Sequence, residues 1–139
     1  MLELPADPSS PARARRFVVH TLDGSFPRDV IESAALLVSE LATNVVLHAG
    51  TPMRLSIESD RAGVRVEVAD ESTALPVMRI QRDSAEAGRG LVLVDRIARA
   101  WGVERLHKGN GKVVWFELGV STVVGTAAVD GRRAVYSAG

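Results

Sequence analysis

Two polar side chains, Glu40 and Asn44, lie four residues apart in an otherwise apolar stretch of the chain. At about 100° per residue, this spacing places both on one face of a helix, so a carboxylate and an amide would project together. Such oxygen groups suit Mg²⁺, and a carboxylate can take a proton from a hydroxyl group or water. Equally, Glu40 could be an exposed edge residue and Asn44 a hydrogen-bonded polar group of a core helix. His48 extends the stripe, but a histidine in the last helical turn also favours the helix dipole.

A second candidate is Asp70, which ends the alternating sequence of residues 64–69. A carboxylate at the end of a strand can accept a hydrogen bond from an exocyclic amine of a ligand. Pro76 follows a few residues later, and a pocket formed there would hold this carboxylate. The alternative is an aspartate that only forms a turn.

The third candidate is the run Gly88-Arg89-Gly90-Leu91, which is expected to open a helix. Glycines allow a close backbone approach, and a helix N-terminus offers free amide groups and a positive dipole end to phosphates. Arg89 would add a charge-assisted contact. Glycines also simply end loops, so the motif gains its weight from its place between a long loop and a helix.

The elements that position these residues can be predicted from periodicity and from boundary residues. Helical spacing predicts three helices, over residues 10–24, 27–48 and 90–100. Alternation predicts two hairpins, with strands over residues 54–59, 64–69, 101–106 and 112–118. Residues 71–89 lose any period and indicate a long loop. This order predicts an α+β domain with helices on one face of a largely antiparallel sheet.

Composition limits the remaining possibilities. The chain has 139 residues, of which 46% are hydrophobic, and this predicts one domain over residues 1–119 followed by a flexible C-terminal tail over 120–139. Seventeen basic residues balance seventeen acidic ones, so neither nucleic acid nor a membrane surface is an expected partner. The chain has no cysteine, which excludes disulfides and thiolate chemistry. Neither a targeting segment nor a membrane-spanning run is evident, so a cytoplasmic location is expected.

In this order, the segments resemble the N, G1 and G2 boxes of the GHKL ATPases, and specifically those of the bacterial anti-sigma-factor serine/threonine kinases. The matching segments are residues 37–49, residues 66–70 with Pro76, residues 88–94, and a last strand over 111–118. The likeness covers about residues 2–118. It implies a Bergerat-type two-layer α/β sandwich with a mixed, mostly antiparallel sheet, helices on one face, and a lid over residues 75–87.

The resemblance also implies a role for each candidate residue. Asn44 would be a ligand of Mg²⁺, and Glu40 would be the base that takes the proton of an acceptor serine or threonine. Asp70 would bind the adenine amine of ATP, while Gly88 and Gly90 would line its phosphates. The expected nucleotide-binding set is completed by Pro76, Arg89 and Leu91.

Two departures from the family pattern affect the adenine end. Residues 71–74 stand where many GHKL members have glycines, and Val113 stands where a threonine often lies near the adenine. The leading interpretation is an ATP-dependent kinase that phosphorylates an anti-sigma-factor antagonist and also sequesters a sigma factor, with a homodimer as one possible assembly. The alternatives are a nucleotide-gated binding module without phosphotransfer and an interaction domain that has lost its nucleotide.

Overall fold

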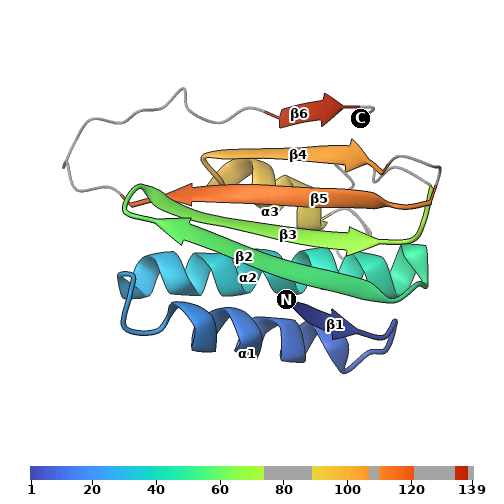
Figure 1. Ribbon diagram of the computed structural model, residues 1–139, viewed down its shortest axis with the longest axis horizontal. Coiled ribbons are helices and arrows are strands. Elements are labelled where there is room, and N and C mark those ends of the chain that lie inside the picture. Colours follow the sequence, from blue (N-terminus) through green and yellow to red (C-terminus); the bar gives the residue numbers. More distant parts are fainter. Residues whose placement is uncertain (74–88, 107–109, 121–133, 138–139) are drawn as a thin grey trace.

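In the described part of the chain, six strands form a single sheet, and the helices lie together on one of its faces (Figure 1). The computed structural model describes residues 1–73, 89–106, 110–120 and 134–137. Its elements are β1 (Leu2–Leu4), α1 (Ser10–Leu22), α2 (Arg28–Asn44), the π-helical turn η1 (Val45–Ala49), β2 (Met53–Asp60), β3 (Gly63–Asp70), α3 (Arg89–Ile97), β4 (Ala100–Arg105), β5 (Lys112–Gly119) and β6 (Ala134–Ser137).

The strand order in the sheet is β1-β2-β3-β5-β4-β6. All neighbours pair antiparallel except β4 and β6, which run parallel. In the view of Figure 1 the sheet lies in front and α1, α2 and α3 cover its far side. The predicted α+β class, a two-layer sandwich with a mixed, mostly antiparallel sheet and helices on one face, is confirmed.

The two edge strands were not predicted from the sequence. β1 (Leu2–Leu4) has three residues, too few for alternation to be recognised, and it pairs with β2. β6 (Ala134–Ser137) lies within the stretch assigned to a flexible tail, residues 120–139, and pairs with β4. The assignment of these four residues to a tail therefore needs correction, because a strand partner far along the chain leaves no local pattern. Residues 121–133 and 138–139 lie outside the described part of the chain.

The core lies between the sheet and the helices. Alternation along β3 and β5 sends every second side chain toward the helices, and α1 contributes one buried residue per turn. The side chains at its centre include Val18, Leu37, Val66, Trp101 and Phe116, all fully buried.

The second helix is less enclosed than its apolar sequence indicates. Leu36 and Leu47 are 39% and 55% exposed, so one side of α2 and η1 faces solvent. The reason is the two-layer architecture, in which a helix that covers a sheet has no second layer on its outer side.

One helical stretch of the described chain, Arg28–Ala49, is long and apolar enough to cross a membrane by length and composition alone, with a mean hydropathy of 1.6. Nearly half of its most apolar window, 44%, is buried inside the protein. Its buried side chains pack in the core between the sheet and α1, where apolar composition is needed. Core helices of this kind make length and composition weak evidence for a membrane span.

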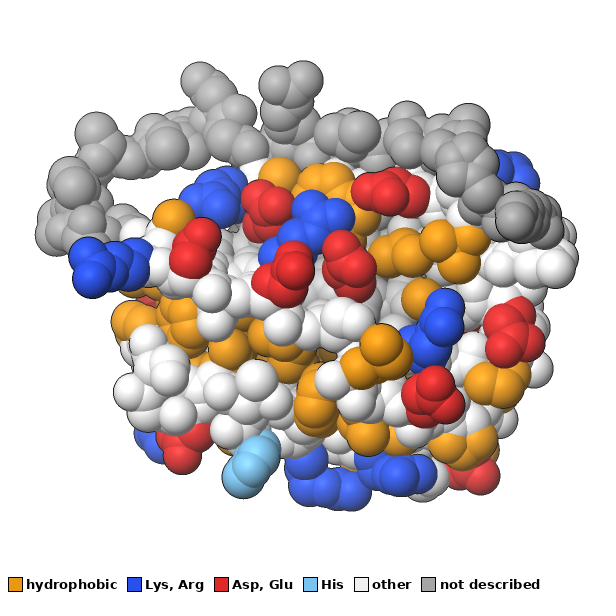
Figure 2. Space-filling model, in the orientation of Figure 1, with side chains coloured by type: hydrophobic (Ala, Val, Ile, Leu, Met, Phe, Trp, Pro, Cys, Tyr) orange, Lys and Arg blue, Asp and Glu red, His pale blue; other side chains and the backbone are white. Residues whose placement is uncertain are grey.

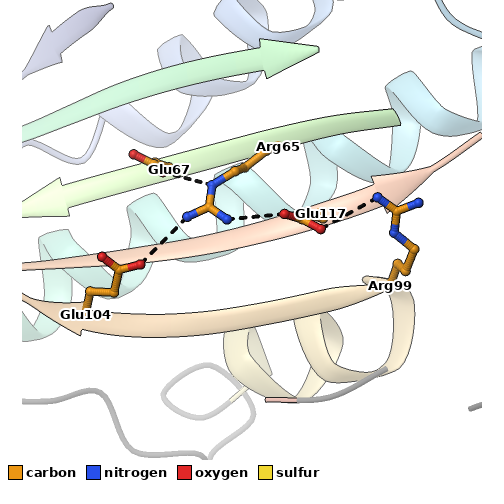
Figure 3. A network of polar contacts seen from close by, with 5 residues as sticks. All are labelled: Arg65, Glu67, Arg99, Glu104 and Glu117. Atoms are coloured by element: carbon orange, nitrogen blue, oxygen red, sulfur yellow. Dashed lines mark hydrogen bonds and ion pairs between the residues drawn. The ribbon is translucent and has the colours of Figure 1, made fainter. Parts of the chain in front are cut away.

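Charged side chains gather at the centre of the outer face of the sheet (Figure 2). Arg65 on β3 donates from Nε to Glu67 at 2.9 Å and from Nη1 to Glu117 at 3.2 Å, and its Nη2 lies 3.8 Å from Glu104 (Figure 3). Arg99 reaches the other oxygen of Glu117 at 3.6 Å. We call these five residues the outer-face network. Opposite charges are paired within it, so it presents no strong field of one sign.

Replacing the central arginine tests how much this network stabilises the fold. The Arg65 guanidinium lies 4.1 Å from the centre of the Trp115 ring, and its side chain is 27% exposed. We expect Arg65→Met to lower the free energy of unfolding by about 1 kcal/mol, because a cation–π contact and partly exposed ion pairs are lost. The difference from wild type should shrink at high salt.

Urea unfolding at two ionic strengths measures this effect. Arg28→Met is the matched control, because the Arg28–Glu32 pair is 4.0 Å apart and its side chains are 90% and 71% exposed. That variant should leave stability unchanged. Equal losses in the two variants would contradict the assigned contribution of the network.

Candidate functional site

Glu40 and Asn44 lie one turn apart on the last turns of α2, and both are half-buried. They border the buried face of the helix, which includes Leu37 and Leu41. In the described part of the structure, the Asn44 side chain receives and donates no hydrogen bond. A carboxylate and an amide therefore lie beside the core and remain partly exposed to solvent.

The helix changes its winding directly after Asn44. The amide of Gly50 donates to the carbonyl oxygen of Val45, five residues back, at 2.8 Å, and Gly50 adopts a left-handed φ of 66°. Such π-helical turns shift the positions that follow and often occur at functional sites. His48 lies within η1 and is exposed, so it does not continue the α-helical stripe of Glu40 and Asn44. The helical stretch ends at Ala49, one residue after the predicted end at residue 48, but the sequence pattern did not predict the π-turn.

Asp70 ends the row of β3 side chains that face the helices. Val64, Val66 and Val68 precede it in this row, and Asp70 is likewise buried, with 4% of the residue exposed. Directly opposite on β5 lies Lys112, whose Nζ is 3.0 Å from Oδ1 of Asp70. The side chains are 7% and 2% exposed, so this is a buried ion pair.

The backbone after Asp70 folds back on the same carboxylate. The amide of Ser72 donates to Oδ1 of Asp70 at 2.8 Å. Sequence analysis expected the residues that replace the family's glycines to change the adenine edge, and one of them here supplies a hydrogen bond to the key carboxylate. This local turn helps to fix the orientation of Asp70.

The end of the second helix and the end of β3 lie at the same edge of the molecule (Figure 1). Thr51, which follows η1, accepts a hydrogen bond from the amide of Glu71 at 3.0 Å through its Oγ1. Met53 at the start of β2 pairs in register with Asp70. The segment after Asn44 is therefore tied directly to the segment around Asp70.

The third helix points toward the same edge. Arg99, just after α3, donates its amide to the carbonyl oxygen of Glu117, which lies at the far end of β5 from Lys112. Since α3 packs against α2 and ends near Glu117, it begins in the direction of Asp70. Its first turn contains Arg89, Gly90 and Leu91.

Three further parts of the predicted site are outside the description. Gly88, Pro76 and the expected lid over residues 75–87 lie beyond the described residues. Glu40, Asn44, Asp70 and the first turn of α3 are the predicted site elements that the structure brings toward one edge.

The structure corrects the expected position of Val113. This residue is half-buried and pairs with Ala69 on β3 and Glu104 on β4. Glu67 lies two residues from Ala69, and Glu117 lies four residues from Val113, so Val113 shares the outer face of the sheet with both glutamates. A shift of one residue along a strand moves a side chain to the opposite face, so Lys112 and not Val113 faces the helices beside Asp70. Sequence analysis missed Lys112. The signal was available, because Lys112 alternates with the inward-facing Val114.

For a metal ion, the described site offers the side-chain oxygens of Glu40, Asn44 and Asp70, and Lys112 adds an ammonium group beside Asp70. Among the residues that the structure describes, no group of three or more His, Cys, Asp or Glu side chains is placed to hold a metal ion. A divalent cation here would therefore need ligands from a bound molecule in addition to Asn44. Phosphate oxygens and water are ligands of this kind.

The polar groups described above lie at one edge of a two-layer α+β sandwich, between its helices and its sheet. The sequence profile of the histidine kinase-like ATPase domain family matches residues 4–118, which run from the end of β1 nearly to the end of β5. The chain belongs to this family, and hence to the GHKL superfamily, whose domains bind ATP. No curated protein matches the chain.

Proposed function

We propose that this chain is an ATP-dependent serine/threonine protein kinase of the anti-sigma-factor type, which phosphorylates an antagonist protein in a partner-switching pathway that controls transcription. The observation that carries the proposal is the placement of Glu40 one helical turn from Asn44, at the edge of the sheet that also holds Asp70. A base, a metal ligand and an adenine acceptor are the groups that phosphoryl transfer from ATP to a hydroxyl requires.

Two groups of described residues support the proposal, one for each end of ATP. Asp70 offers a carboxylate on the helix side of the sheet, and a purine amine is a donor that matches it. The first turn of α3, with Gly90 in it, begins in the direction of this edge, and free amides at a helix N-terminus favour phosphate. Asn44 lies at the end of α2, where its side-chain oxygen would bind a Mg²⁺ ion that the phosphates also hold.

Glu40 supplies the chemistry that distinguishes a kinase from a binding module. It would take the proton of the acceptor serine or threonine while the hydroxyl oxygen forms its bond to the γ-phosphorus and ADP leaves. When bound, Mg²⁺ would neutralise the charge of the phosphates. Charge neutralisation and positioning of the reactants contribute most to the catalysis of phosphoryl transfer. Glu40 is half-buried, so a partner can reach it from the surface.

The proposed partners follow from this activity. They are the antagonist protein, a sigma factor that the chain sequesters, and a second copy of the chain in a homodimer, all in the cytoplasm. The second candidate function is a nucleotide-gated binding module without phosphotransfer. The observation that favours this candidate is the replacement of glycines after Asp70 by residues 71–74.

Calorimetric titration with Mg²⁺-ATP tests the nucleotide site. We expect wild type to bind, and Asn44→Ala to bind about tenfold or more weakly, because a contact to a charged group is lost. Ser39→Ala is the matched control, since Ser39 is a polar residue of the same helix whose hydroxyl bonds to the carbonyl oxygen of Leu36. It should bind like wild type.

Two results would contradict the proposal. Absence of heat from wild type at millimolar ATP would remove the nucleotide site altogether. Equal affinity of a folded Asn44→Ala variant would remove Asn44 from the metal position. Transfer of label from γ-labelled ATP to a purified antagonist then separates the kinase from the binding module.

A further inference from the structure

The Asp70 carboxylate is used unequally by its neighbours. Both hydrogen bonds that it receives, from Nζ of Lys112 at 3.0 Å and from the amide of Ser72 at 2.8 Å, end on Oδ1. Within the described residues Oδ2 receives none. One oxygen is therefore occupied, and the other is open as an acceptor.

The open oxygen is also reachable. In the described part of the protein, every side-chain nitrogen or oxygen that is fully buried has a hydrogen-bond partner. Since Oδ2 of Asp70 receives no hydrogen bond from the described residues, it keeps some contact with solvent, although the side chain as a whole is only 2% exposed. Asp70 faces the helices, on the side where the nucleotide is proposed to bind.

The packing of this row of side chains does not by itself explain the Lys112–Asp70 ion pair. The preceding inward-facing pair in the same two strands is Val68 opposite Val114, both buried. Apolar pairs of similar volume are often as stabilising as a buried ion pair, or more so, because burying charges has a desolvation cost. An ion pair at the end of this apolar row therefore calls for a role other than stability.

The charge state of Asp70 determines which base it can bind. An ionised carboxylate only accepts hydrogen bonds, whereas a protonated one also donates. Adenine carries an amine donor at the position where guanine carries a carbonyl acceptor. An acceptor-only oxygen therefore favours adenine and disfavours guanine, because two acceptors would face each other.

We propose that Lys112 is a positioning and specificity-determining residue, which pairs its ammonium group with Oδ1 of the Asp70 carboxylate, leaves Oδ2 open as an acceptor, and thereby makes the site select adenine over guanine. The inference rests on the proposed nucleotide site and extends it to a residue that the sequence analysis did not include. Lys112 acts through Asp70 and does not itself contact the base.

The test compares the affinities for ATP and GTP by calorimetry in wild type, Lys112→Met, Lys112→Gln and Lys112→Arg. We expect wild type to prefer ATP, and the Met and Gln variants to lose about tenfold or more of this preference. Lys112→Arg keeps the charge and should retain most of it. Arg54→Met, which removes one positive charge from an exposed position on β2, is the matched control and should behave like wild type.

A purely structural lysine would change thermal stability without changing the ratio of the two affinities. Lys112→Gln keeps a donor for Oδ1, so it serves as the folded uncharged variant if Lys112→Met does not fold. An unchanged ATP/GTP ratio in a folded uncharged variant would overturn the role of Lys112 and leave the ATP site standing. Tighter ATP binding by these variants would show that Lys112 obstructs Asp70, which also overturns it. Failure of wild type to bind ATP would overturn the proposed function and this inference together.

Discussion

Glu40→Gln is expected to retain ATP binding and to reduce phosphotransfer to a serine or threonine of the partner by about 10²- to 10⁴-fold. The substitution keeps the size of the side chain and its ability to form hydrogen bonds, but it removes the group that takes the hydroxyl proton. Glu40 shares its helix side with Asn44, so base and metal ligand would meet at the γ-phosphate. Binding and catalysis should therefore separate in this variant.

A label-transfer assay with purified antagonist, at equal occupancy of the nucleotide site, measures the effect. Glu32→Gln is the matched control, because Glu32 lies on the same helix with its side chain 71% exposed, and it should transfer label at the wild-type rate. Equal incorporation by Glu40→Gln and wild type would exclude Glu40 as the base. No label from any of the proteins, with ATP bound, would favour the non-catalytic binding module.

Gly111→Ala is expected to lower the free energy of unfolding by about 3 kcal/mol or more. Gly111 has a φ of +116°, which L side chains rarely adopt, and a Cβ there would overlap the carbonyl oxygen of Asp70 and lie 3.3 Å from Cα of Glu71. The left-handed backbone accounts for about 1–2 kcal/mol, and the overlap with a backbone that is fixed by its strand adds about 1–3 kcal/mol. Because the displaced atoms belong to Asp70, a folded variant should also bind ATP more weakly.

Gly24→Ala separates these two causes. Gly24 has a similar φ of +82°, but a Cβ there would meet nothing within 4 Å. This variant should lose only about 1–2 kcal/mol and keep its ATP affinity. Chemical denaturation and an ATP titration of both variants measure the difference, and equal losses of stability would show that contact with Asp70 has no effect.

The hairpin of β2 and β3 shows how well local patterns work in this chain. Residues 64–69 alternate between Val and other residues, and the structure extends the predicted strand by only one residue at each end, to Gly63–Asp70. The same holds for α1, whose predicted start at Ser10 is observed. In these elements, neighbouring residues carry the whole signal, since one face of each must be buried.

The sequence by itself determined the order of the three helices and the four central strands. It also determined that the helices lie on one face of the sheet, and where Glu40, Asn44 and Asp70 lie along these elements. Alternation and helical spacing are local properties, so they can be recognised without knowing which elements pack against each other. Tertiary structure alone decided the pairing of β6 with β4, the π-turn after Asn44, and the ion pair between Asp70 and Lys112. Each of these depends on strand register or on helix winding, which the local sequence pattern does not fix. A shift of one residue in the register of β5 would place Val113 instead of Lys112 on the helix side of the sheet.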